Sequence, residues 1–231
     1  MKKLHLILLF IYIAAAPSCK KVAPNTSQAK IAVTDLVLNQ IKQMGYSTQL
    51  VVPFQDGYLV ENDILINVKD LGIKHTGMSL NIAKTEQYRT TAVVQFWPRT
   101  ITIRLENLSS FYSQALDEAI ARYNRLSLGL TFLRTTSIAS DIRVIGFSGE
   151  SYDPLAFVGA SVNGNTGGFP GGGNPGSLIN VNTNKVTPIE SVFWAASILQ
   201  HEIGHTIGMR HTDYMNRSYS CGIGGGKILV H

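Results

Sequence analysis

Residues 201–211 read His-Glu-Ile-Gly-His-Thr-Ile-Gly-Met-Arg-His, a stretch with three histidines and one acidic residue at fixed spacing. On a helix, His201 and His205 stand four residues apart, so both imidazoles project from one face about one turn apart. Two ring nitrogens at that separation can bind one Zn²⁺ ion at about 2.0–2.1 Å. The spacing therefore predicts a helix that presents a pair of metal ligands.

The second half of the stretch supplies a third ligand. Gly208 follows the second histidine, and glycine enters a left-handed conformation at the least cost. Such a turn ends the helix and lets His211 swing back towards the metal. Three protein ligands leave the fourth zinc position open, which is typical of a catalytic site. The competing interpretation, a surface helix with three unrelated histidines and a glycine cap, leaves the fixed offsets unexplained.

Glu202 lies beside the first ligand and is the candidate catalytic residue. Its carboxylate is placed to act as a general base on a zinc-bound water. The whole stretch fits the pattern H-E-x-x-H-x-x-G-x-x-H, which combines a zinc site with this carboxylate. Two residues after the last histidine, Asp213 is either a group that orients a zinc-bound histidine or a simple turn residue.

Composition suits one globular domain with appendages and excludes other classes. The 231 residues are 45% hydrophobic and 15% charged, with a formal net charge of +5. The basic residues are scattered, so no nucleic-acid partner is expected. The glycine-rich residues 164–176 lack the Gly-Lys-Ser/Thr of a phosphate loop, which argues against nucleotide binding. We expect a monomer.

The N-terminus is typical of an exported protein. Lys2 and Lys3 precede an apolar run at 4–16, and small residues lead to Cys19. This arrangement resembles the lipobox of bacterial lipoproteins. It predicts a signal peptide over 1–18, lipidation of Cys19, a tether over 19–30 and a membrane anchor on the cell envelope. The alternative is a plain secretory signal and a secreted protein; both place the mature chain outside the cytoplasm.

Hydrophobic periodicity outlines a mixed α+β domain. The expected helices are 31–44, with apolar positions at Ile31, Leu36, Leu38 and Ile41, a second from Ser109 or Ser110 to Tyr123, and a buried third over 188–209. The expected strands are 50–52, 58–60, 100–105, 130–134, 141–147, 157–162 and 177–182.

This order of elements, together with the zinc motif, resembles the metzincin metallopeptidases. Residues 201–213 are similar to the dual-action HEIGH metallopeptidases, relatives of the astacins. Trp97-Pro98 followed by Ile101-Thr102-Ile103 resembles the start of the mature astacin domain. Val60-Glu61-Asn62-Asp63-Ile64 resembles the astacin pro-segment motif Phe-x-Gly-Asp.

The resemblance implies a metzincin-like zincin domain, a twisted mixed sheet packed on two long helices, over 89–231. It also implies a pro-like region over 31–88 and a zinc endopeptidase acting on extracytoplasmic protein or peptide substrates. Substrate would lie along an edge strand, for which Gly159 and Ala160 are candidates because small residues let another backbone approach. Asp63 would take the open zinc position and keep the enzyme latent; the alternative is a turn residue between strands.

One departure concerns the C-terminal end. Metzincins place a methionine turn beneath the zinc, and Met215 follows His211 too closely to loop away and return. We therefore expect an incomplete lower lobe, a catalytic domain truncated after the third histidine and no partner for Cys221. This departure favours the alternative function, a non-catalytic zinc-binding surface lipoprotein.

Overall fold

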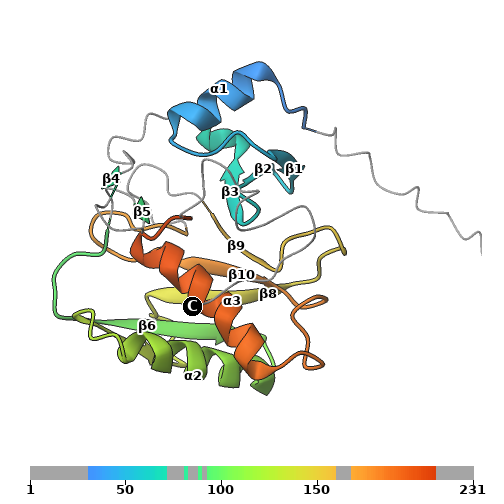
Figure 1. The fold of residues 1–231 in the computed structure, drawn as a ribbon. Helices are drawn as coiled ribbons and strands as arrows, with labels where there is room; N and C mark the ends of the chain where they lie inside the picture. The colour runs from blue at the N-terminus through green and yellow to red at the C-terminus, as the bar shows by residue number, and fades with distance from the viewer. Residues whose placement is uncertain (1–30, 72–80, 83–87, 90–92, 160–167, 212–231) are drawn as a thin grey trace, which may run out of the picture. The chain divides into compact units, whose positions relative to one another are not determined.

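The computed structural model describes residues 31–71, 81–82, 88–89, 93–159 and 168–211 (Figure 1). The elements in chain order are α1 (Asp35–Gln43), β1 (Val52–Phe54), β2 (Gly57–Val60), β3 (Ile64–Asn67), the 3₁₀ helix η1 (Val68–Asp70), β4 (Asn81–Ile82), β5 (Tyr88–Arg89), β6 (Arg99–Glu106), α2 (Ser110–Asn124), β7 (Leu130–Arg134), β8 (Ile142–Phe147), β9 (Ala156–Gly159), β10 (Leu178–Asn182) and α3 (Val192–Ile207).

A mixed sheet organises these elements. Its strand order is β1-β2-β3-β9-β10-β8-β6-β7, while β4 and β5 form a separate pair. Neighbours β7, β6, β8 and β10 run parallel, β9 is antiparallel to β10, and β3 is parallel to β9. The mixed sheet expected from the sequence is confirmed.

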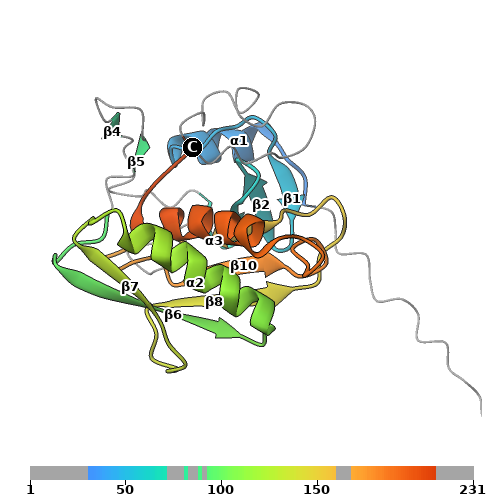
Figure 2. The ribbon, with the colours of Figure 1, turned by 60° about the horizontal axis from the view of Figure 1, so that its bottom comes forward.

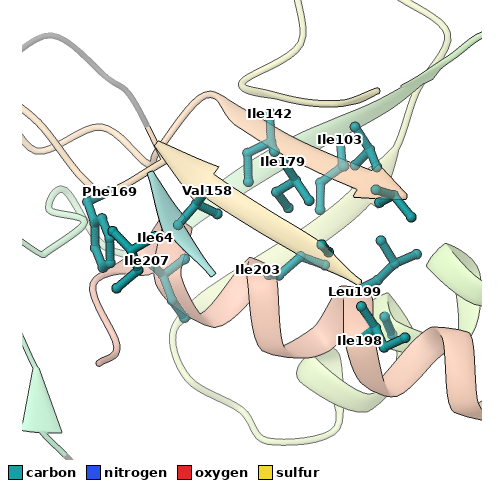
Figure 3. Packing of buried hydrophobic residues seen from close by; sticks show 14 of the residues in the cluster. Ile64, Ile103, Ile142, Val158, Phe169, Ile179, Ile198, Leu199, Ile203 and Ile207 are labelled. Carbon is teal, nitrogen blue, oxygen red and sulfur yellow. The ribbon is translucent and has the colours of Figure 1, made fainter. Parts of the chain in front are cut away.

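Two long helices, α2 and α3, lie side by side against this sheet (Figures 1 and 2). The Tyr123 hydroxyl of α2 donates to the carbonyl of Gln200 in α3 at 2.9 Å. From α3, Ile203 and Ile207 enter the same core as Ile179 of β10 and Val158 of β9 (Figure 3). The apolar stripe of α2 is buried as the helical period requires; its members are Phe111, Tyr112, Ala115, Leu116, Ala119, Ile120 and Tyr123.

The expected pro-like region forms part of the same sheet. Side chains of β3 alternate between two cores: Ile64 and Ile66 lie in the main core, while Leu65 packs with Phe157 in a second cluster. In that second cluster the rings of Phe54 and Phe157 meet edge to face with centroids 5.3 Å apart. Because both faces of β3 are buried, its sequence is continuously apolar from Ile64 to Ile66, as such strands require. This segment is therefore an integral part of the folded sheet.

Most expected elements are present, with two corrections. Helix α1 buries Val37 and Ile41, while Leu36 is 68% exposed. The prediction for Leu36 is wrong because the helix begins at Asp35, after the Thr34 N-cap, and turns a different face to the core. Strand β9 is not an edge of the sheet, because β3 pairs with it through Ile64 and Leu65. Among the described residues, no helix is long and apolar enough to cross a membrane.

Candidate metal centre

Helix α3 carries the first two histidines and ends in a left-handed turn. It begins after Ser191, whose hydroxyl accepts a hydrogen bond from the Trp194 N–H at 3.1 Å. It ends at Gly208, which has φ 108° and ψ 6°. The N–H of Met209 then donates to the Gly204 carbonyl at 2.9 Å, which closes the turn. The turn expected at Gly208 is present, and it brings His211 back beside the helix.

The three histidines converge on one point through their Nε2 atoms. His201 Nε2 lies 3.1 Å from His205 Nε2 and 3.1 Å from His211 Nε2. Asp63 completes the group: its Oδ2 is 2.9 Å from His211 Nε2, 3.1 Å from His201 Nε2 and 3.9 Å from His205 Nε2. Asp63, His201, His205 and His211 thus form one cluster of metal-ligating atoms.

The spacing of these atoms fits a tetrahedral zinc ion. Ligands about 2.0–2.1 Å from the metal stand roughly 3.3–3.4 Å apart at the corners of a tetrahedron. The separations of His201 Nε2 from His205 Nε2 and from His211 Nε2, both 3.1 Å, are close to this edge length. Asp63 Oδ2 stands at the fourth corner, the position that three histidines alone leave open. The turn that delivers it includes Asn62 at φ 74°, a conformation that asparagine tolerates.

Hydrogen bonds on the far side of two rings fix their tautomers. His205 Nδ1 lies 2.9 Å from the carbonyl of Met209, so Nδ1 carries the proton and Nε2 keeps its lone pair. His211 Nδ1 lies 3.0 Å from Oε2 of Glu61. This carboxylate oxygen accepts the Nδ1 proton, so Nε2 of His211 also keeps its lone pair. This arrangement is typical of metal-binding histidines. It supports Nε2 as the ligand atom in both residues.

Glu61 is a site residue that sequence reasoning missed. Its side chain is fully buried, and Oε1 accepts from the Ser47 N–H at 3.0 Å and from the Arg210 guanidinium. Burial opposes ionisation, but the hydrogen bond from His211 and the charge of Arg210 outweigh it and keep the pKa of Glu61 below its usual value. The available signal was an acidic residue two positions before Asp63, in the segment whose alternative interpretation was a turn between strands.

Glu202 follows the first ligand, His201, in α3 and is buried. It is 2% exposed, and its Oε2 is a buried oxygen without a hydrogen-bond partner among the described residues. Burial, and then the charge of Asp63, raise its pKa well above the usual value. A buried carboxylate oxygen is costly unless a ligand or a water satisfies it.

Two other groups of the centre, His205 and Asp63, have pKa values shifted towards the forms that bind a metal. Burial, despite the opposing effect of the nearby Asp63 carboxylate, lowers the pKa of His205 to about 4, so this ring is neutral at physiological pH. Burial opposes ionisation of Asp63 as well, but the neighbouring histidines hold its pKa well below the usual value. Neutral imidazoles and an ionised carboxylate are the forms that bind a metal.

Four further predicted positions have different outcomes. Gly159 ends β9, and its pairing edge is taken by β3, as described above. Ala160, Asp213 and Cys19 lie outside the described residues, as do the predicted lower lobe, the predicted truncation and Cys221.

Comparison with known proteins places this centre in a family. Residues 59–227 match the family model described as dual-action HEIGH metallo-peptidase, which covers well over half of the chain. The chain belongs to this family of metallopeptidases. Because the family and the cluster of Asp63, His201, His205 and His211 agree, zinc is its cofactor.

Solved structures of myroilysin are similar to the chain at low identity. One, "Structure of myroilysin", has 18% identity and a TM-score of 0.38, and the match covers 52% of this chain and 52% of that chain. Another, "Crystal structure of myroilysin", has 16% identity and a TM-score of 0.39, with 65% and 52% covered. The chain thus spans about half the length of these myroilysin chains. No curated protein matches.

Proposed function

We propose that this dual-action HEIGH family member is a zinc endopeptidase that cleaves protein or peptide substrates. The observation that carries the proposal is that Glu202, next in sequence to His201, has a buried carboxylate oxygen with no hydrogen-bond partner within the described part of the chain. A protein that only stores or binds zinc has no chemical need for such a carboxylate. The alternative, a non-catalytic zinc-binding lipoprotein, leaves the burial of Glu202 unexplained.

In the proposed reaction, Glu202 moves the proton. Zinc, when bound, polarises the scissile carbonyl and lowers the pKa of water towards about 7. Glu202 accepts a proton from the attacking water at its free Oε2 and passes it to the leaving amine. Helix α3 presents His201 and His205, and the turn at Gly208 brings in His211 and the Met209 carbonyl that His205 faces. The reaction needs Glu202 ionised, whereas burial, and then the charge of Asp63, raise its pKa.

The position of Asp63 among the three histidines is the one expected of a latent enzyme. Asp63 Oδ2 stands where the reacting oxygen needs to be, 2.9 Å and 3.1 Å from two ligand nitrogens. Strand β3 pairs with β9, the strand beside which substrate is expected. Both observations support the proposal that residues 31–88 act as a pro-region, and that activity follows when cleavage between about residues 84 and 97 lets the Asp63 turn move out of the open zinc position, whether or not the fragment dissociates.

Two variants test the peptidase proposal together. His205→Ala should lose most of the zinc found by metal analysis. Glu202→Ala should keep zinc and lose peptidase activity by about 10²–10⁴-fold, the usual contribution of general acid–base catalysis. Activity is measured on a quenched fluorescent peptide after limited proteolysis of the chain. Full zinc in the histidine variant, or equal activity in the glutamate variant, would sink the proposal.

The localisation is a separate proposal. We propose that the chain is exported and anchored by a lipid on Cys19, on the cell envelope. Cys19→Ala should move the protein from the detergent phase to the aqueous phase in a phase-partitioning experiment. A wild-type protein that already partitions into water would show a secreted protein instead.

A further inference from the structure

Glu61 lies behind the third ligand, on the side away from the ligand atoms. It occupies a turn between β2 and β3, with φ 52°, and its side chain is fully buried. Its two oxygens serve different partners. Oε2 faces His211 Nδ1 at 3.0 Å, and Oε1 accepts from Arg210 and from the Ser47 N–H.

We propose that Glu61, which belongs to the pro-like region, is a positioning residue that builds the zinc site by orienting His211 and compensating Arg210. The inference rests on the proposed zinc site and adds a second role for the turn that carries Asp63. Asp63 stands at the open corner of the tetrahedron and competes with water. Glu61 supports a ligand from behind and raises the affinity for the metal.

The first support for this role is the charge around the ligands. Arg210 is 5% exposed and precedes His211 directly. Its guanidinium lies 4.3 Å from the ring centroid of Tyr46 and 5.9 Å from that of Phe169. A buried guanidinium next to a ligand opposes binding of a doubly charged cation. Glu61 is the carboxylate that offsets this charge at hydrogen-bond distance.

The second support is the continuity of packing behind the ligands. The ring of Phe169, which faces Arg210, also lies against His205 with centroids 5.3 Å apart. Glu61, Arg210 and Phe169 therefore connect the backs of two ligand rings. A ligand ring whose far nitrogen is held by a carboxylate loses less freedom on binding metal and is a stronger base.

The test measures zinc affinity of the full-length protein by competition with a chromophoric chelator. Replacement of residues that orient a metal-binding histidine typically costs about 10–100-fold in affinity. We expect a loss of that size for Glu61→Ala. Glu61→Gln keeps an acceptor for His211 but loses the charge, so a smaller, measurable loss is expected.

A matched control separates positioning from general stability. Asp70 is another buried carboxylate of the same region, 4% exposed, and accepts from Asn67 Nδ2 at 3.2 Å. Asp70→Asn should leave zinc affinity unchanged, whatever it does to the thermal midpoint. The thermal midpoint of each zinc-free variant is recorded, because a merely structural role would lower that midpoint without changing the affinity of the folded protein.

Each outcome bears on the inference. Should Glu61→Ala fail to fold, the near-isosteric Glu61→Gln decides the question. Equal affinity in wild type and Glu61→Gln, or an equal loss in Asp70→Asn, would overturn the positioning role and leave the peptidase proposal intact. A wild-type chain that binds no zinc would overturn the peptidase proposal too, so the two failures are distinguishable.

Discussion

At the residue scale, one short turn supplies two carboxylates with opposite effects on the metal centre. Asp63 directs Oδ2 at the ligand nitrogens, while Glu61 supports a ligand from behind. The left-handed conformations of Glu61 and Asn62, with φ 52° and φ 74°, reverse the chain between them. These two adjacent left-handed residues let side chains only two positions apart reach different sides of His211.

Removing the blocking carboxylate should release activity in the uncut protein. Asp63→Ala opens the fourth corner of the ligand group, so basal peptide cleavage should rise about tenfold or more, since tenfold needs only about 1.4 kcal/mol of preference for the blocked state. The activity of the proteolytically trimmed form should not change. Asp56→Ala removes an exposed carboxylate of the same segment and serves as the control. Equal basal activity in the uncut wild type and Asp63→Ala would reject latency.

The ligands could be predicted from sequence because they are local. His201, His205 and His211 fall within eleven residues, and helix geometry and one glycine turn decide their arrangement. Glu61 could not be predicted, because it reaches His211 across 150 positions of chain through strand pairing. No periodicity or motif in the sequence encodes that pairing; only the assembled sheet does.

At the scale of single elements, the end of α3 controls the third ligand. An alanine at φ 108° is strained, since left-handed conformations cost ordinary residues about 1–2 kcal/mol. Gly208→Ala should therefore lower both the free energy of unfolding and the zinc affinity. Gly208→Asn should lose less, because asparagine tolerates this region. Denaturant unfolding and chelator competition measure the two effects; an asparagine variant worse than alanine would contradict the explanation.

The strand expected to receive substrate is packed closely against a neighbouring glycine. A Cβ added at Gly168 would lie 2.1 Å from the Val158 Cβ and 2.6 Å from the Gly159 nitrogen. Gly168→Ala must therefore displace β9, and we expect a loss of about 1–3 kcal/mol of stability. Among the described residues, the nearest atom to a Cβ at Gly159 is the Gly168 nitrogen at 3.9 Å, so Gly159→Ala is the matched control. Thermal midpoints that fall equally in both variants would show that the close approach is not the cause.

The sequence predicted the elements better than their neighbours in space. Strands 130–134 and 142–147 and helix 110–124 follow from periodicity, because each has one core-facing side. Strand β9 was expected at an edge since its small residues suit a close approach. The approach exists, but β3 makes it, and only tertiary structure can decide which segment occupies an edge.

At the scale of the whole molecule, the pro-like region and the catalytic part share one core. Ile41, Val60, Ile64 and Ile66 are all 0% exposed and lie in the main hydrophobic cluster. Full burial of one such side chain contributes about 1.5–3 kcal/mol. The joint core means that cutting the chain and separating its parts are different events.

Cleavage alone should therefore not release the N-terminal fragment. After limited proteolysis between residues 84 and 97, both fragments should elute together in size-exclusion chromatography and separate only in denaturant. Zinc content should stay unchanged in the nicked complex. Elution of the small fragment alone under native conditions would contradict the shared core. The same digest of Asp63→Ala shows whether loss of the Asp63 contact alone loosens the fragment.

The position of the Asp63 turn in the chain has a consequence for the order of events during synthesis. Asp63 precedes His201 by 138 positions and His211 by 148. A ribosome therefore makes the blocking carboxylate well before any of the histidines that it contacts. When the last ligand emerges, its competitor for the metal is already attached to the same polypeptide. If Asp63 blocks the zinc as proposed, the peptidase is inhibited from the moment its metal site forms.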